Sequence, residues 1–370
     1  MDASCERTGP LVGLRVLELG AVGPGPHAGM ILADMGADVV RIDRPGGTQL
    51  GQPDATDTML RGRRRVDADL KSADGRRTFF ELVAHADVLL EGYRPGVAER
   101  LGVGPDLCLA SNPRLVYARA TGWGQDGPWA NKAGHDMNYL SLTGALHALG
   151  RADECPPPPL NLVGDYGGGS MLLLGGLLAA LWHAERTGQG QVVDAAMVDG
   201  VTTLTQKVWS WRAQGRWNDD RESNFIDGGS PWYRCYRCAD GRFMAVCAVE
   251  PQFYAELLVG LGLSADALPP QRDAAGYPEL TKVFEEAFAS RTRDEWAAVF
   301  VDLDACTTPV LDWTEAPHHP HIAGRGTIVH RDGVPEAGPA PRFSRTPLTL
   351  PERMQDPIPV DHVVADWNRP

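Results

Sequence analysis

The fold is decided by residues 14–43, whose sequence is LRVLELGAVGPGPHAGMILADMGADVVRID. Residues 14–19 and 38–42 are short apolar runs rich in Val, Ile and Leu, and a helical pattern that starts at about Pro26 separates them. Two such runs with a helix between them are typical of parallel strands that are covered on both faces. We therefore expect this stretch to begin a parallel sheet.

The same alternation continues through the first half of the chain. Apolar runs at 87–90 and 115–120 predict further strands, and residues 75–86 predict a helix before the first of them. Two more helices are expected at about 168–185 and 198–214. The pattern predicts a large Rossmann-like α/β domain formed by residues 1–215, to which the segment 325–370 returns.

A smaller α+β domain is expected over residues 225–320. Residues 232–249 alternate around Asp240-Gly241, which is a strong hairpin signal. Helices are expected at 252–261, 277–290 and 293–303, and the Pro- and His-rich residues 316–351 resemble a long return linker. Linkers of this length are unusual inside a compact monomer and suggest a chain that wraps around a partner.

Composition excludes several classes of partner. The formal net charge of −13 disfavours nucleic acid and anionic membrane surfaces, unless a local basic patch intervenes. The longest apolar run, residues 171–182, is shorter than the roughly 20 residues that span a bilayer. With no apparent targeting signal and an odd number of cysteines, 7, we expect a cytoplasmic protein with reduced thiols.

Gly23, Gly25 and Ala28 form a G-x-G-x-x-A pattern after the first strand, and Asp43 follows twenty residues after Gly23. This is the spacing of a dinucleotide fingerprint. Two prolines within the pattern alter the turn that brings backbone amides to pyrophosphate. A plain glycine-rich turn between strand and helix is therefore favoured over a nicotinamide or flavin site.

Basic residues gather in the segment that follows Asp43, which suggests a phosphate-rich ligand in an otherwise acidic protein. Arg94 is the most persuasive of them, because it follows an apolar strand at the edge where open α/β sheets bind ligands. Scattered solvated arginines are the alternative interpretation. The members of this cluster are Arg44, Arg61, Arg63, Arg64, Arg65, Lys71, Arg94 and Arg100.

Other candidate sites have weaker signals. Cys235 and Cys238 form a single C-x-x-C pair without a second pair to complete a zinc site. His318, His319 and His321 lie in a Pro-rich segment without carboxylates at a fixed spacing. No G-x-S-x-G motif is present, which disfavours serine hydrolase chemistry. We expect no metal site.

Two turns carry residues that can transfer protons. His135 begins a helical pattern, with Asp136 next to it, and Asp165 lies on a glycine-rich turn that leads into another helix. Each of these residues also makes sense as a surface or helix-capping group. Their combination is more informative: an imidazole titrates near neutrality, a carboxylate can complement it, and helix starts supply amide donors for an oxyanion.

Long stretches of the chain resemble the family III coenzyme A transferases, and within that family its racemase branch. The resemblance covers nearly the whole sequence. It is carried by GLRVLEL at 13–19, ADVVRIDRP at 37–45, EGYRPG at 91–96, TGWGQDG at 121–127, GHDMNY at 134–139, NLVGDYGGGS at 161–170, QVVDAAMVDG at 191–200, VEPQF at 249–253 and PRFSRT at 341–346.

The resemblance implies a set of functional residues. His135 and Asp165 would be the catalytic pair, with Glu250 supporting the histidine and Asp136 close by. Coenzyme A would contact Arg44, Ala68, Asp69, Leu70, Lys71, Gly92, Tyr93, Arg94, Pro95, Gly96, Arg100, Gly134, Met137, Asn138 and Tyr139. The family's fold implies an interlocked homodimer, and no cofactor is expected because coenzyme A is part of the substrate.

The activity implied is the inversion of the carbon next to the thioester of a 2-methylacyl-CoA. The transferase branch instead uses the aspartate at the position of Asp165 as a nucleophile. Transferases carry a glutamine in the first glycine turn, where this chain has Gly23, and they lack the full GHDMNY motif; this favours the racemase. Branched fatty, steroid side-chain and arylpropionyl thioesters all remain open as substrates.

Overall fold

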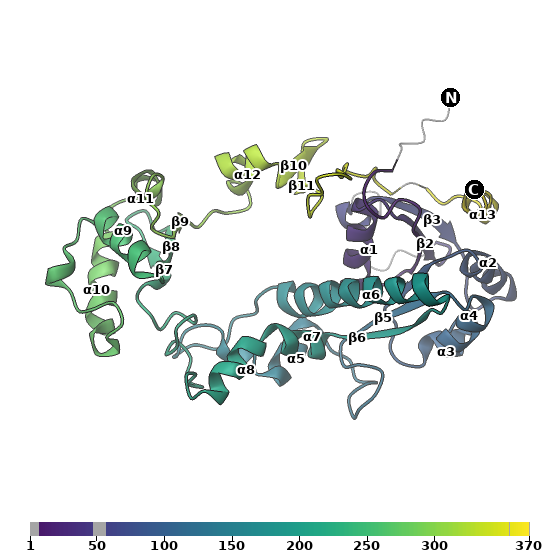
Figure 1. The fold of residues 1–370 in the computed structure, drawn as a ribbon, viewed down its shortest axis with the longest axis horizontal. Coiled ribbons are helices and arrows are strands. Elements are labelled where there is room, and N and C mark those ends of the chain that lie inside the picture. Colours follow the sequence, from purple (N-terminus) through teal and green to yellow (C-terminus); the bar gives the residue numbers. More distant parts are fainter. Residues whose placement is uncertain (1–6, 47–56, 355, 370) are drawn as a thin grey trace. The chain divides into compact units, whose positions relative to one another are not determined.

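A computed structural model describes residues 7–46, 57–354 and 356–369. The chain divides into two compact units (Figure 1). Unit 1 consists of Met1–Thr143, Pro158–Gln206 and Arg325–Pro370, and unit 2 consists of Gly144–Pro157 and Lys207–Gly324. Each unit is described by itself.

Unit 1 is built on a six-stranded parallel sheet in the order β3-β2-β1-β4-β5-β6. The strands are β1 (Arg15–Leu19), β2 (Asp38–Asp43), β3 (Arg63–Asp67), β4 (Val88–Glu91), β5 (Val116–Thr121) and β6 (Gln191–Ala196). The strand order reverses between β1 and β4, and open α/β sheets bind ligands outside the carboxyl ends of their strands at such a point. The predicted α/β class with a Rossmann-like parallel sheet is confirmed.

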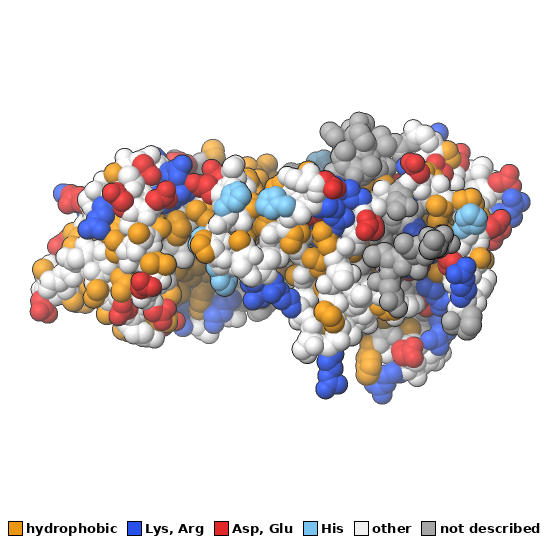
Figure 2. Space-filling model, turned by 90° about the horizontal axis from the view of Figure 1, so that it is seen from above, with side chains coloured by type: hydrophobic (Ala, Val, Ile, Leu, Met, Phe, Trp, Pro, Cys, Tyr) orange, Lys and Arg blue, Asp and Glu red, His pale blue; other side chains and the backbone are white. Residues whose placement is uncertain are grey.

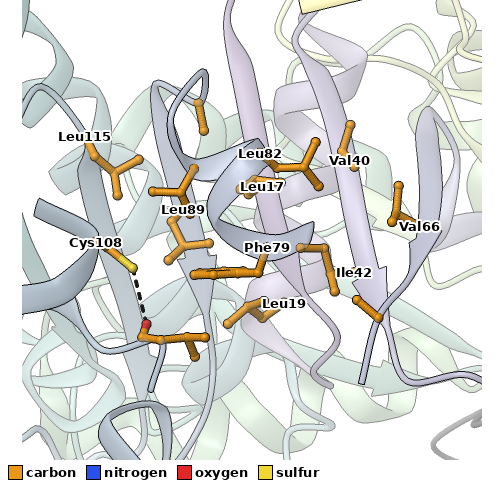
Figure 3. Close-up of a cluster of buried hydrophobic side chains, with 14 of the residues drawn as sticks. Leu17, Leu19, Val40, Ile42, Val66, Phe79, Leu82, Leu89, Cys108 and Leu115 are labelled. Atoms are coloured by element: carbon orange, nitrogen blue, oxygen red, sulfur yellow. Dashed lines mark hydrogen bonds between the residues drawn. The ribbon is translucent and has the colours of Figure 1, made fainter. Parts of the chain in front are cut away.

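Both faces of this sheet are covered. Leu17, Val40 and Leu89 point to one face, where they pack with Phe79 and Leu82 of the helix α2 (Ala73–Val83; Figure 3). Their neighbours along the strands point to the other face, against the helices α1 (Pro24–Asp34) and α6 (Met171–Thr187). The near-continuous apolar runs in the sequence follow from this burial on both sides.

The helices of unit 1 are α1 (Pro24–Asp34), α2 (Ala73–Val83), α3 (Val97–Leu101), α4 (Pro105–Ser111), α5 (Asp136–Thr143), α6 (Met171–Thr187), α7 (Met197–Leu204) and α13 (Val360–Trp367). The last of these closes the core beside α2: Val363 and Trp367 are buried there. The Trp367 indole donates a hydrogen bond of 2.8 Å to Asp38 Oδ2. The end of the chain is thus bound to the second strand.

Strand β3 has the sequence RRRVD, which we interpreted as part of a ligand-binding basic cluster. That interpretation is wrong for four residues of the cluster. Arg61 pairs with Asp34, Arg63 with Glu18, Arg64 with Asp38 and Arg65 with Asp67. These guanidinium groups neutralise carboxylates of unit 1 and are already engaged in hydrogen bonds.

Two helices differ from the prediction. The helix expected at 168–185 starts earlier, as a nine-residue π-helix (Leu162–Ser170) that continues directly into α6. Together Leu162–Thr187 form the one described helical run that is long and apolar enough to cross a membrane by length and composition alone, a test that buried core helices also pass. The helix expected at 198–214 is interrupted at Thr205, between α7 and α8 (Gln206–Ala213).

Unit 2 contains an antiparallel sheet in the order β7-β8-β9, formed by β7 (Tyr233–Arg237), β8 (Phe243–Cys247) and β9 (Thr307–Pro309). Its main helices are α9 (Pro251–Leu261), α10 (Tyr277–Phe288) and α11 (Arg293–Phe300), close to the predicted positions. Their apolar faces share a core with Trp232, Tyr236 and Met244. The predicted hairpin is formed by β7 and β8.

The region expected to be a long linker has structure of its own. It contains α12 (Pro320–Arg325) and a hairpin of β10 (Ile328–Arg331) and β11 (Val334–Ala337). Glu336 of this hairpin is buried and pairs with Arg61 and Arg331. The expectation of an unstructured linker failed because buried ion pairs, rather than an apolar pattern, hold this hairpin.

Candidate active site

Asp165 lies in the first turn of the π-helix that precedes α6. The widened π-turn is rare and is frequent at functional sites. Glycines make this turn possible: a Cβ atom on Gly164 would lie 2.6 Å from Asp136 Oδ1, and one on Gly168 would lie 2.8 Å from the backbone nitrogen of Val201. The sequence VGDYGGG therefore lets a strained helical turn pack closely against α5 and α7.

A second carboxylate adjoins Asp165. Asp136, the first residue of α5, is buried, and its Oδ1 accepts a hydrogen bond of 2.7 Å from the backbone N–H of Asp165. The buried Oδ2 of Asp136 has no hydrogen-bond partner within the described protein. Burial raises the pKa of Asp165, and the Asp136 carboxylate raises it further.

Two neighbours act in the opposite direction. The Asn161 side-chain amide donates to Asp165 Oδ2 at 3.5 Å, and His135 is close enough to act electrostatically on the carboxylate. Both lower the pKa of Asp165, but they do not outweigh the burial and the second carboxylate. Asp165 is therefore a carboxyl group that holds its proton more tightly than usual, within electrostatic reach of an imidazole.

His135 lies immediately before α5, with an exposed side chain. Its backbone N–H donates to Asn138 Oδ1 at 3.1 Å, and its carbonyl accepts from the N–H of Asn138 at 2.8 Å. This reciprocal pairing fixes the start of the helix. The imidazole remains accessible while its backbone is held, as a proton-transfer group requires.

Aromatic residues support the backbone around His135. The Tyr139 hydroxyl donates to the carbonyl of Gly134, and its ring packs against Gly122 and Gly134 so closely that neither could carry a Cβ atom. Trp123 meets Tyr139 edge-on, with ring centroids 4.8 Å apart. Burial raises the pKa of Tyr139 to about 12, so its hydroxyl stays protonated and keeps donating.

A cavity of about 280 Å³ lies at the carboxyl ends of the first strands. Most of the expected coenzyme A contacts in this part of the chain line it. They are Arg44, Ala68, Asp69, Leu70, Lys71 and Tyr93, joined by Gly20, Ile42, Asp43 and Leu101. The side chains of Arg44 and Lys71 are exposed, whereas Ala68 and Leu70 are buried in the wall.

The remaining expected contacts lie in the loop after β4 and at the start of α5. The carboxylate of Glu91 shapes this loop by accepting the Tyr93 N–H at 2.7 Å and pairing with Arg119 at 2.6 Å. Arg94 is exposed and acts electrostatically on Tyr139, so this loop and the His135 segment are neighbours. Of the other expected contacts, Gly92, Arg100, Met137 and Asn138 are exposed, and Pro95, Gly96 and Gly134 are half-buried.

The glycine-rich turn after β1 faces Asp165. Gly23 precedes α1 with φ of 74°, and a Cβ atom on it would lie 3.4 Å from Asp165 Oδ2. Pro24 and Pro26 supply no N–H groups to the first turn of this helix. A pyrophosphate would thus meet a carboxylate and few donors, which argues against the dinucleotide interpretation.

The structure leaves some expectations open and adds residues that were missed. Glu250 precedes α9 in unit 2, so its support of His135 stays a prediction. Asn161 and His27 were not singled out, although both lie inside quoted motifs. Asn161 lies four residues before Asp165, the spacing of one helical turn, and this spacing could have indicated it. His27 carries no local signal, because its contact with Ser170 joins segments 143 residues apart. Asp43, noted only for its dinucleotide spacing, and Leu101 also line the cavity.

The weaker candidate sites gain no support. Within the described ranges, no group of three or more His, Cys, Asp and Glu side chains could hold a metal ion. Cys235 is exposed and Cys238 is buried, and both are free thiols. His318, His319 and His321 flank the start of the short helix α12.

Comparison with known proteins gives a consistent result. The profile of CoA-transferase family III matches residues 11–358. An alpha-methylacyl-CoA racemase of Mus musculus is 46% identical over 356 residues, 96% of this chain and 91% of that protein. The alpha-methylacyl-CoA racemase of Homo sapiens is 44% identical over 359 residues, 95% of this chain and 91% of that protein. The crystal structure of a CAIB/BAIF family protein from Brucella suis superimposes with a TM-score of 0.82 at 25% identity, covering 98% of this chain and 100% of that chain.

Proposed function

Because the chain belongs to CoA-transferase family III, we propose that its site inverts the carbon next to an acyl-CoA thioester, as a racemase of 2-methylacyl-CoA. The observation that carries this proposal is the pairing of an accessible imidazole, His135, with a carboxyl group of raised pKa, Asp165. The two mammalian relatives named as alpha-methylacyl-CoA racemases support the same activity.

The chemistry is a 1,1-proton transfer. One group removes the proton from the carbon next to the thioester, and the electron pair moves onto the thioester oxygen to give an enolate. The other group delivers a proton to the opposite face of the planar intermediate, and the thioester is restored. A raised pKa brings Asp165 towards the operating pH, so it can hold a proton for delivery and accept one in the reverse direction.

The start of α5 suits the developing oxyanion. The first N–H groups of a helix have no partner within the helix, and they favour negative charge. His135 lies directly before this turn. The N–H groups of Asn138 and Tyr139 donate to the His135 carbonyl, so an enolate oxygen placed here would meet the N–H groups of Asp136 and Met137, next to the base that creates it.

The cavity at the strand ends supports a coenzyme A handle. It combines the apolar wall of Ala68 and Leu70 with the exposed cations Arg44 and Lys71. This combination suits an adenosine nucleotide with phosphates. Binding energy from such a handle would fix the reacting carbon between the two proton-transfer groups.

Single substitutions test the division of roles. In buffered deuterium oxide, the wild-type protein should exchange the C2 proton of both enantiomers. We expect His135→Ala to retain exchange with one enantiomer, through Asp165, and Asp165→Ala to retain exchange with the other. Each variant should lose racemisation, with the residual exchange about 100-fold or more slower. Absence of C2 exchange by the wild-type protein would contradict the proposal.

The second candidate is a CoA-transferase in which Asp165 attacks the thioester carbonyl. In that reaction the carbon–sulfur bond breaks, coenzyme A leaves as its thiolate, and an aspartyl anhydride forms. The coenzyme A thiolate then attacks the aspartyl carbonyl of this anhydride and releases the original acid, and a second carboxylic acid takes coenzyme A from the resulting aspartyl thioester. Hydroxylamine should trap Asp165 as a hydroxamate, and coenzyme A should pass from the acyl thioester to an added carboxylic acid. The family profile keeps this candidate in view, while the identity to the racemases favours proton transfer.

We also propose that the reaction needs no nicotinamide, flavin or metal ion, because the two proton-transfer groups account for the chemistry. Protein that has been desalted and treated with a chelator should keep its full exchange rate. Restoration of activity by added NAD would instead revive the dinucleotide interpretation of the turn at Gly23.

The protein is proposed to act as a homodimer. Helix α6 presents a stripe of exposed apolar side chains, with Met171, Leu178 and Trp182 exposed by 53, 37 and 66%. Residues 7 and 11 positions apart lie on one helix face. Figure 2 shows hydrophobic side chains interspersed with charged ones on the face that it draws. We propose that a second copy of the chain covers the apolar stripe on α6.

We place the protein in the cytoplasm and in the metabolism of lipids or of other substituted acyl thioesters. All six described cysteines are free thiols, as a reducing compartment requires. A panel of 2-methylacyl-CoA thioesters with branched fatty, steroid side-chain and arylpropionyl tails, assayed for C2 deuterium incorporation, should identify the preferred acyl chain. Cell fractionation checks the compartment.

A further inference from the structure

His27, in the first turn of α1, contacts the π-helix that contains Asp165. Asp165 lies in the first turn of this π-helix, and His27 contacts its last residue. Its imidazole Nδ1 lies 2.6 Å from Ser170 Oγ, at the last residue of the π-helix. Its ring stacks on Tyr166, with centroids 4.4 Å apart and planes inclined by 27°. His27 therefore touches both the residue that follows Asp165 and the residue that ends the turn.

The hydrogen bonds define which nitrogen of His27 carries the proton. The Ser170 hydroxyl has one hydrogen, which it donates to the Tyr166 carbonyl at 3.1 Å. The close contact with His27 then requires that Nδ1–H donates to Ser170 Oγ. The pKa of His27 is lowered, chiefly by burial and then by Arg63 and Arg61, so the neutral imidazole with a protonated Nδ1 is favoured.

The Tyr166 carbonyl is the point where this chain of hydrogen bonds reaches the backbone. It accepts from Ser170 Oγ and also from the N–H of Met171, five residues further along, which is the bond of a π-turn. A π-turn is less favourable than an α-turn and persists only when its surroundings fix it. The contacts of His27 supply such a constraint from outside the helix.

Helix α1 also touches the other side of Asp165. The His27 N–H donates to the Gly23 carbonyl at 3.3 Å, and Gly23 lies against the Asp165 carboxylate. The first turn of α1 thus contacts the Asp165 carboxylate through Gly23 and the end of the π-helix through His27. A change in the register of the π-turn would move Asp165 away from both Gly23 and Asp136.

We propose that His27 is a positioning residue for the proposed racemisation, which holds the π-turn in register through Ser170 and Tyr166 and thereby places the Asp165 carboxylate. This inference rests on the proposed function. His27 itself transfers no proton, and its effect is confined to the half-reaction that uses Asp165. Neither its sequence position nor the proton-transfer pair alone predicts this role.

The test compares two substitutions that each keep one contact. His27→Phe keeps a ring to stack on Tyr166 and removes the donor, whereas His27→Asn keeps an amide nitrogen near the position of Nδ1 and removes the ring. The initial rate of C2 deuterium incorporation is measured for each enantiomer separately. The enantiomer whose exchange disappears in Asp165→Ala reports on Asp165, and the other enantiomer reports on His135.

We expect His27→Phe to slow the Asp165-dependent exchange by about 10-fold or more, while the His135-dependent exchange and KM change by less than about threefold. His27→Asn should restore most of the lost rate. Ser170→Ala removes the same hydrogen bond from the other side and should give the same selective loss, which keeps the test decisive if His27→Phe does not fold.

Three outcomes would overturn the inference: an equal loss for both enantiomers, no loss in either His27→Phe or Ser170→Ala, or an Asn variant no better than the Phe variant. A general loss of stability would slow both exchanges together, so the ratio of the two rates separates positioning from folding. If the wild-type protein shows no C2 exchange, the proposed function itself has failed, and this result is distinct from the other three.

Discussion

The two carboxylates of the site, Asp136 and Asp165, have different roles. Asp136 is buried and accepts the backbone N–H of Asp165, so it acts as a fixed part of the scaffold. Its charge also raises the pKa of Asp165. An isosteric substitution of Asp136 can therefore separate its hydrogen bond to the Asp165 backbone from its effect on the pKa of Asp165.

Asp136→Asn should separate them. An asparagine keeps an oxygen that accepts the Asp165 N–H but removes the negative charge, so the pKa of Asp165 should fall. In the direction in which Asp165 is the base, kcat/KM declines as pH drops through this pKa, and the acid limb of the profile should therefore move to lower pH. pH profiles measured in both directions check this, with the exposed Asp74→Asn of α2 as a control. An unmoved limb would contradict it.

Arg94 should act on binding rather than on chemistry. Its exposed guanidinium lies near the His135 segment, but the proton-transfer groups do not depend on it. A charge-assisted hydrogen bond to a phosphate is worth about 1.5–3 kcal/mol. Arg94→Ala should raise KM by about 10-fold or more and change kcat by less than about threefold.

Steady-state kinetics and competition by free coenzyme A measure this effect of Arg94. Arg77→Ala is the matched control, because Arg77 is an exposed arginine on α2 that pairs with Asp74 and Glu81. A loss in kcat at unchanged KM would assign Arg94 to the reaction instead of the handle.

Among the elements, the crossing of the π-helix with α7 tolerates the least change. A Cβ atom on Gly200 would lie 1.9 Å from the Gly168 carbonyl oxygen. The two helices contact each other there through their backbones. Gly200→Ala should therefore destabilise the protein by about 3 kcal/mol or more, or prevent its folding.

A glycine in α12 provides the control for Gly200. Gly324 is exposed, and no atom lies within 4 Å of a Cβ atom built on it. Because alanine is the better helix former, Gly324→Ala should be neutral or stabilise the protein by up to about 1 kcal/mol. Thermal unfolding of the two variants compares them, and an equal loss in both would show that the crossing is not tight.

Strands with continuous apolar runs in their sequence were predictable. Elements that are held by ion pairs or by close glycine contacts were not. Strands β1, β2, β4 and β5 follow from Val and Leu runs that both layers of helices cover. Strand β3 was missed because its arginines are accommodated by ion pairs, and the hairpin of β10 and β11 depends on buried charges in the same way. The π-turn has no local signal, since its register comes from glycine contacts with α5 and α7.

The site was predictable to a similar degree. The residues His135, Asp136 and Asp165 were recognisable from their motifs, and the structure brings them together. The hydrogen bond from Asn161 to Asp165 spans four residues and lies within one motif. The close approach of Gly23 to Asp165 instead joins segments more than a hundred residues apart. A contact of the second kind cannot be predicted from spacing along one chain.

The whole molecule should associate through α6. Leu178→Glu places a charge within the exposed apolar stripe of this helix, where a second copy would have to desolvate it. Sedimentation velocity should show the wild-type protein as a dimer and Leu178→Glu with at least a 10-fold weaker association. Leu107→Glu, at an exposed leucine of α4, is the matched control. A wild-type protein that stays a folded monomer at low concentration would contradict the dimer.

The position of α13 has a consequence for the order in which unit 1 completes its core. Val363 and Trp367 close the core beside α2, and Trp367 binds Asp38, 329 residues earlier in the chain. Unit 2, whose segments all precede the end of α12, lies between these two partners in the sequence, so it can complete its own core before α13 docks. The part of the unit 1 core beside α2 that α13 covers stays open until then. A chaperone that shields apolar surface should therefore remain bound at this part of unit 1 during synthesis and leave when α13 docks.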